Sequence, residues 1–148
     1  MNFEDLSKQF FQTFSRVEYS LKASGFHNGE GRAEPNWLKF ADAVESIIEH
    51  PNSPSLSEAI NYILTNPPKS QFIRDEQIRW EDSNPGQNTK SKELFIYLTR
   101  VRNNLFHGGK VNGQIFPADR REKLLRYSIL ILESCIHHLP EVREVFHA

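Results

Sequence analysis

A helical periodicity of apolar residues constrains the fold of this chain more than any other feature. Near the start, apolar side chains return every three or four residues, at Phe3, Leu6, Phe10, Phe14, Val17 and Leu21. One helical turn contains 3.6 residues, so this spacing collects them on one face of an α-helix. The pattern predicts an amphipathic helix from about residue 3 to Ala23, ended by Ser24 and Gly25.

Similar stripes recur along the chain, and no long segment alternates between apolar and polar residues as a half-buried strand would. A second helix should begin with Pro35 in its first turn and end at Pro51, and Ser55 or Ser57 can cap a third that ends at Asn66. Further helices are expected from about residue 94 to the glycines at 108–109, over 118–138, and as a final turn over 141–146. Residues 69–80 are compatible with a short helix, 81–91 with a surface loop, and 110–117 with a small β-excursion.

Length and composition limit the possible classes of protein. The 148 residues suffice for one domain, 1–148, with its own core, which predicts an all-α bundle of four or five main helices. The net charge of −1 provides no overall field toward nucleic acid, so any RNA binding requires a local patch. The single cysteine, Cys135, excludes an internal disulfide framework, and the start lacks the pattern of a signal peptide.

The same composition predicts a cytoplasmic protein without a membrane anchor or cofactor. The longest apolar run, Ile129 to Leu132, is far too short to span a bilayer. The histidines at 137, 138 and 147 have no partners at the spacing of a metal site in the sequence, so no metal is expected.

One stretch carries residues suited to phosphodiester chemistry. Arg102 is followed at once by Asn103 and five positions later by His107, just before a glycine pair. A guanidinium binds phosphate through a planar fork of donors, and histidine is the side chain best suited to proton transfer near neutrality. With ten Arg and six His, this spacing alone is expected about 0.4 times by chance, so its context at a predicted helix end matters.

The geometry of this stretch leaves alternatives open. Arg102 and His107 lie about 140° apart on a regular helix, so either the glycines free the direction of His107 or a two-fold dimer completes the site. The non-catalytic alternatives are that His107 caps the helix end and that Arg102 pairs with Glu18 or Glu93.

Basic residues gather around the same place. Between residues 100 and 126 there are seven Lys or Arg and only two acidic residues. Such a cluster can bind an RNA backbone, or it can be the solvated start of the last helix. The residues predicted to contact RNA are Arg100, Lys110, Arg120 and Arg121.

The Arg102–Asn103–x3–His107 stretch resembles the R-x4-H motif of the HEPN superfamily. The segments Phe14–Tyr19 and Trp37–Ala41 also look like the first two helices of small prokaryotic HEPN proteins. The resemblance implies a metal-independent endoribonuclease, usually dimeric, in a toxin–antitoxin or defence system. It also implies an antitoxin partner such as a nucleotidyltransferase.

In such an enzyme, His107 would serve as base or acid and Arg102 would stabilise the phosphorane, with Asn103 orienting His107 or the phosphate. The products would be a 2′,3′-cyclic phosphate and a 5′-hydroxyl. Glu18 is a candidate for orienting Arg102 or His107, although a solvent-exposed ion pair is the alternative for it.

The last long helix is apolar on most sides, which predicts that a second copy of the chain covers it near the Arg102–His107 segment. A different class of function is a non-catalytic HEPN module that binds a protein or nucleotide. Burial of His107 and an ion pair at Arg102 would favour that module.

Overall fold

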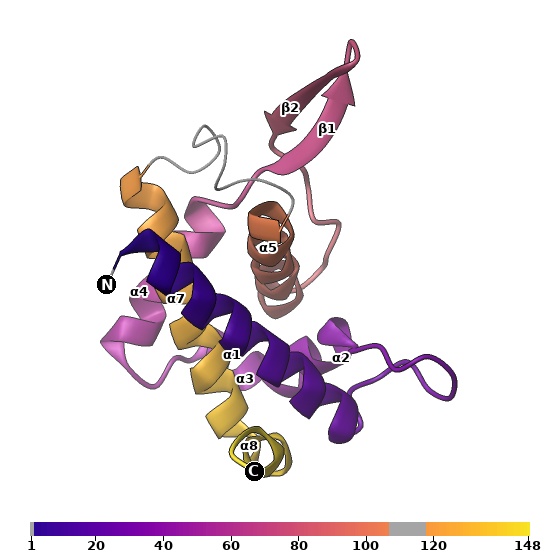
Figure 1. Ribbon diagram of the computed structural model, residues 1–148. Helices are drawn as coiled ribbons and strands as arrows, with labels where there is room; N and C mark the ends of the chain where they lie inside the picture. Colours follow the sequence, from indigo (N-terminus) through magenta and orange to yellow (C-terminus); the bar gives the residue numbers. More distant parts are fainter. Residues whose placement is uncertain (1, 107–117) are drawn as a thin grey trace.

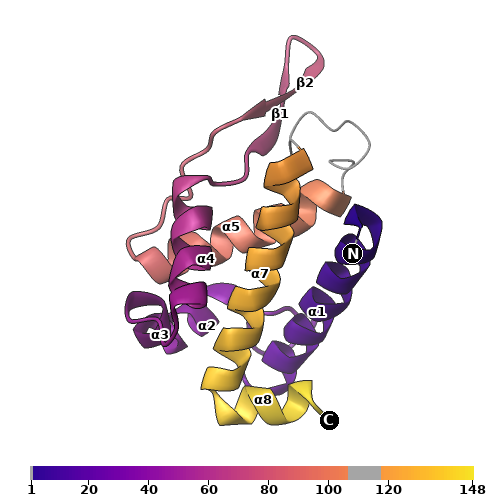
Figure 2. The same ribbon diagram turned by 90° about the vertical axis from the view of Figure 1, so that its left-hand side faces the viewer.

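The described structure is a bundle of helices with one projecting hairpin (Figures 1 and 2). The computed structural model describes residues 2–106 and 118–148, in which seven helices and a two-stranded sheet are found. The helices are α1 (Phe3–Ala23), α2 (Trp37–Ala43), α3 (Glu45–Glu49), α4 (Pro54–Thr65), α5 (Lys90–Asn104), α7 (Ala118–His138) and α8 (Pro140–Phe146). The strands are β1 (Ser70–Arg74) and β2 (Gln77–Glu81). The helical class predicted from the sequence is therefore confirmed.

Helix α7 lies at the centre of the bundle. It packs against α1 on one side and α4 on the other, while α5 crosses beneath and contacts α2, α3 and α4 (Figure 2). Helix α8 lies across the far end of α1 and α7. The apolar circumference of α7 is consequently buried within a single chain: Leu124, Leu125, Ile129, Ile131, Leu132, Cys135 and Ile136 are buried, and Leu130 is partly buried. This burial removes the argument for a dimer that rested on an uncovered last helix.

Helix starts follow local capping rules. The Asn2 side chain accepts a hydrogen bond from the Asp5 amide at 2.8 Å and begins α1 where the periodicity predicts. Helix α4 is capped by Ser53, with Pro54 as its first residue. The prediction that Ser55 or Ser57 caps this helix was therefore wrong, because the cap lies earlier in the chain.

The second predicted helix is divided in two. Asn36 caps α2, and the backbone leaves helical geometry at Val44, where φ is −107° and ψ is 12°. Helix α3 then begins at Glu45 and ends before Pro51. Val44, Ile47 and Ile48 are all buried, so the apolar stripe continues through the break. The periodicity of the sequence therefore did not indicate that the helix is interrupted.

The short helix expected over residues 69–80 was wrong, because this segment forms the β1–β2 hairpin. Its strands pair antiparallel with Ile73 opposite Ile78. The turn residues Asp75 and Glu76 have φ values of 50° and 62°, the left-handed conformation that two-residue hairpin turns require. Glycine or asparagine usually occupies such positions, so the Asp–Glu pair gave no turn signal. The β-excursion predicted for 110–117 lies outside the described residues.

The core is rich in aromatic side chains where α1, α2 and α5 meet. The Phe14 ring lies 5.0 Å from Trp37, and the Trp37 ring stacks 5.8 Å from Phe95. Phe40 and Phe10 complete the cluster, which connects α5 to the middle of α1 through Trp37 of α2. Within the described residues, no helix combines the length and apolar character that crossing a bilayer requires.

Candidate functional site

The described part of the predicted motif lies at the C-terminal end of α5. Thr89 caps this helix by accepting a hydrogen bond from the Lys92 amide, and a buried stripe that includes Leu98 and Val101 seats it on the core. Successive residues point about 100° apart around the axis. Arg102 is accordingly half-buried and the next side chain, Asn103, is exposed.

Arg102 packs on the aromatic cluster. Its guanidinium carbon lies 5.4 Å from the centroid of the Phe14 ring, which is a favourable cation–π geometry. Its Nε is buried without a hydrogen-bond partner. Among residues 2–106 and 120–148, whose side chains the structure describes, the ion pairs are Arg74–Glu81 and Lys92–Asp42, so none of these residues supplies a carboxylate to Arg102.

Glu18 lies one turn after Phe14 on α1 and contacts the neighbouring aromatic ring. Its Oε2 accepts a hydrogen bond from Trp37 Nε1 at 3.0 Å. Arg102 and Glu18 therefore contact two rings that touch each other, Phe14 and Trp37. In the described structure Glu18 positions Trp37, while neither ion pair considered for Arg102, with Glu18 or with Glu93, is formed.

Asn104 has a structural role that the sequence did not indicate. It is buried, and its Nδ2 donates a hydrogen bond of 2.7 Å to the backbone oxygen of Lys69. This bond fastens the segment entering β1 to the end of α5 beside Arg102. An asparagine near a helix end is ordinary in a sequence, so only the contact reveals the role.

Two of the predicted RNA-binding residues bind the backbone of this chain. Arg120 Nη2 donates to the oxygens of Asn66 and Pro67 at 2.9 and 2.8 Å, and Arg100 Nη1 donates to that of Ser83 at 2.9 Å. Burial lowers the pKa of Arg100 from its ordinary value. We refer to Arg100 and Arg120 with these carbonyls as the loop clamp.

Arg121 was also predicted to contact RNA, and it packs on an aromatic ring and is not part of the loop clamp. The guanidinium carbon of Arg121 lies 4.2 Å from the centroid of the Phe3 ring, and its Nε is buried without a hydrogen-bond partner. His107 and Lys110 lie outside the described residues. The structure thus brings Arg102 and Asn103 to the same helix end.

The backbone leaves α-helical geometry just after Asn104, the last residue of α5. Leu105 is buried, Phe106 is 74% exposed, and both lie in a wider, π-type turn. Hydrogen bonds in such a turn link residues five apart instead of four, and single π-type turns often mark functional sites.

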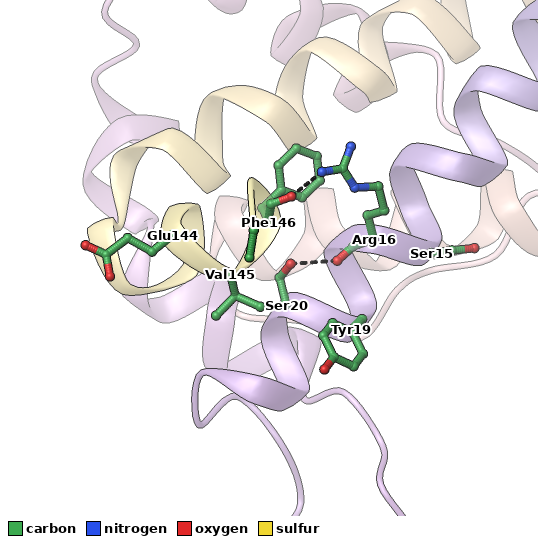
Figure 3. A pocket seen from close by; sticks show the side chains of 8 residues that line it. Ser15, Arg16, Tyr19, Ser20, Glu144, Val145 and Phe146 are labelled. Atoms are coloured by element: carbon green, nitrogen blue, oxygen red, sulfur yellow. Dashed lines mark hydrogen bonds between the residues drawn. The ribbon is translucent and has the colours of Figure 1, made fainter.

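A shallow pocket of about 650 Å³ lies elsewhere, between α1 and α8 (Figure 3). Arg16 donates a hydrogen bond to the Phe146 oxygen, and its guanidinium carbon lies 4.4 Å from the centroid of the Phe146 ring. Ser20, in turn, donates to the Arg16 oxygen at 2.7 Å. None of the residues predicted for RNA chemistry lines this pocket.

Comparisons with family models, curated proteins and solved structures found no match to this chain. Within the described residues, no three His, Cys, Asp or Glu side chains are grouped in a way that could hold a metal ion.

Proposed function

We propose that this chain is a HEPN-like, metal-independent endoribonuclease in which Arg102, Asn103 and His107 act together. The observation that carries the proposal is the state of Arg102. It is the arginine of the motif, it lies near the end of α5 on an aromatic ring, and no carboxylate of residues 2–106 or 120–148 pairs with it. A guanidinium held in this way keeps donors for a phosphate.

The proposed reaction uses the RNA's own 2′-hydroxyl as nucleophile. A base removes its proton, the 2′-oxygen forms a bond to phosphorus, and the bond from phosphorus to the 5′-oxygen breaks as an acid protonates that oxygen. His107 serves as one of these two groups. Arg102 stabilises the negative charge on the equatorial oxygens, and Asn103 orients His107 or the phosphate.

The π-type turn supports the pairing of Arg102 with His107. On a regular helix, residues five apart diverge by about 140°. The turn at Leu105 and Phe106 lies between the two motif positions and departs from regular α-geometry, so the divergence of a regular helix does not apply to this stretch.

A protein-binding HEPN module is the second candidate, and the hairpin favours it. Ile73 and Ile78 face each other across the strands and are 66% and 50% exposed. The loop clamp also reduces the basic surface left for RNA. Exposed apolar pairs of this kind are more typical of protein contacts than of nucleic-acid contacts.

Incubation of purified protein with RNA in excess EDTA distinguishes the two candidates. We expect cleavage that leaves 2′,3′-cyclic phosphate ends, and no cleavage by His107→Ala at unchanged circular dichroism. Cleavage that disappears with the chelator, or that persists in His107→Ala, would contradict the proposal. No cleavage of any RNA, with retention of a protein partner, would favour the binding module.

A further inference from the structure

Two histidines from different helices meet where α8 lies across the end of α7 (Figure 2). His137 lies in the last turn of α7, and His147 directly follows α8. Their Nε2 atoms are 3.0 Å apart, and their ring centroids are 5.0 Å apart. Both side chains are exposed to solvent.

The tautomer of His137 follows from its second ring nitrogen. Nδ1 lies 2.7 Å from the backbone oxygen of Glu133, one turn earlier. A carbonyl oxygen only accepts hydrogen bonds, so Nδ1 carries the proton and the neutral ring presents the lone pair of Nε2 to His147. Metal-ligating histidines are commonly oriented in this way by a backbone carbonyl.

The distance between the two nitrogens suits a shared metal ion. With bonds of about 2.0–2.1 Å, two nitrogens of a tetrahedral ion lie roughly 3.3 Å apart, and adjacent nitrogens of a square-planar ion roughly 2.9 Å apart. The observed 3.0 Å falls between these values. In the metal-free chain the same contact is a hydrogen bond from Nε2–H of His147 to Nε2 of His137. Metal binding therefore requires the His147 proton to move to its Nδ1, together with small rotations of the two exposed rings.

We propose that His137 and His147 form a two-histidine site for a divalent first-row transition metal ion such as Zn²⁺, Ni²⁺ or Cu²⁺. Imidazole nitrogens favour these ions over Mg²⁺ and Ca²⁺, which prefer oxygen ligands. Water fills the remaining positions because both side chains face solvent. The two histidines are ten positions apart in the sequence, a spacing that does not suggest a metal site, and the site does not depend on the proposed ribonuclease activity.

A metal ion at this site would join α8 to α7. Helix α8 is already held by buried Val142 and Phe146, and Arg143 Nη1 donates to the His137 oxygen at 3.2 Å. A metal ion that binds only the folded chain raises its thermal stability by mass action. A bound metal ion would therefore strengthen the docking of α8 onto α7.

The test uses the full chain without a histidine tag and adds NiCl₂ or ZnCl₂ alone. Isothermal titration should show one equivalent bound, with a matching rise in the unfolding temperature. His147→Gln retains a hydrogen-bonding side chain but loses the imidazole ligand. We expect at least about tenfold weaker binding, since loss of even an outer-shell partner commonly costs 10–100-fold.

His138→Gln is the matched control, because this neighbouring histidine contacts Ser46 Oγ at 3.3 Å instead of His147. It should bind metal like the wild type. Equal affinities for wild type and His147→Gln, or no binding at millimolar metal, would overturn the proposal.

Histidine ring spectra of the wild type provide a readout that needs no variant. In a ¹H–¹⁵N long-range experiment, Zn²⁺ should shift the Nε2 resonances of His137 and His147 together, with His27 and His50 unchanged. Shifts confined to other histidines would contradict the site. This measurement also decides the question if His147→Gln fails to fold.

Discussion

The arginines at the end of α5 and those of the loop clamp show how one residue type takes two different roles within a short stretch of chain. Arg120 bonds two backbone oxygens and Arg100 bonds one at 2.9 Å, so both help to hold connecting segments against the bundle. Arg102 rests on the Phe14 ring, and the described chain offers it no acidic partner. All three lie in the basic cluster that the sequence shows.

A count of positive charges therefore overestimates the number of guanidinium groups that remain available to an external ligand. A guanidinium that satisfies backbone carbonyls is part of the fold, and its removal leaves partly buried acceptors without their charged donor. A guanidinium stacked on an aromatic ring is positioned while its donors stay available.

The largest effect is expected at Arg102. If this residue stabilises the phosphorane, Arg102→Ala should lower the rate of RNA cleavage about 100- to 1,000-fold, as does loss of a donor that binds a developing oxyanion. Arg102→Lys should not restore the rate, because an ammonium lacks the planar fork. Single-turnover kinetics on a defined RNA measure the effect, and a Lys variant with the wild-type rate would refute it.

Mixed variants test whether the site is shared between two chains. If each site draws its arginine and histidine from different protomers, Arg102→Ala and His107→Ala proteins should recover part of the activity when mixed. Light scattering at micromolar concentration must then show a dimer. Activity without recovery would assign both residues to the same chain.

A loss of stability, and not of catalysis, is expected for the loop clamp. Arg120→Ala should lower the free energy of unfolding by about 1–3 kcal/mol, because the oxygens of Asn66 and Pro67 lose their charged donor. Arg126→Ala, on an exposed position of the same helix, is the control and should change it by less than about 0.5 kcal/mol. Urea denaturation compares them, and equal midpoints would show that the clamp contributes nothing.

A smaller effect concerns the salt dependence of RNA binding. Each phosphate contact on a single strand contributes about 0.7 to the slope of log affinity against log salt. Lys110→Ala should therefore reduce the slope by about 0.7, whereas Arg120→Ala should leave it unchanged. Fluorescence anisotropy with a labelled RNA and His107→Ala protein as background gives the slopes. A reduced slope for Arg120→Ala would instead indicate that this arginine contacts RNA.

The smallest effect is expected at the hairpin turn. Asp75 and Glu76 adopt left-handed conformations that side chains disfavour, so Asp75→Asn with Glu76→Gly should stabilise the protein by about 0.4–1 kcal/mol. Gln77→Gly, inside β2, should instead weaken it. Thermal unfolding distinguishes the two, and destabilisation by the turn variant would mean that the native Asp–Glu turn makes compensating contacts.

The sequence by itself determined the elements whose signals are local. The bounds of α1 and α7 were predicted from periodicity to within a residue, because apolar residues on one face and a cap or breaker at each end suffice to define a long helix. The position of Arg102 and Asn103 near the end of a helix was also predicted, since it depends only on α5.

The tertiary structure decided what depends on residues far apart in the chain. Arg120 and Asn66 are 54 positions apart, and the hydrogen bond between them gives this arginine a structural role that its sequence context did not indicate. Likewise, the strands β1 and β2 form because their residues pair with each other, despite a turn without glycine. His137 and His147 meet only because α8 turns back across α7. Periodicity reports which face of an element is buried, whereas the partner that covers it is set by how the elements pack.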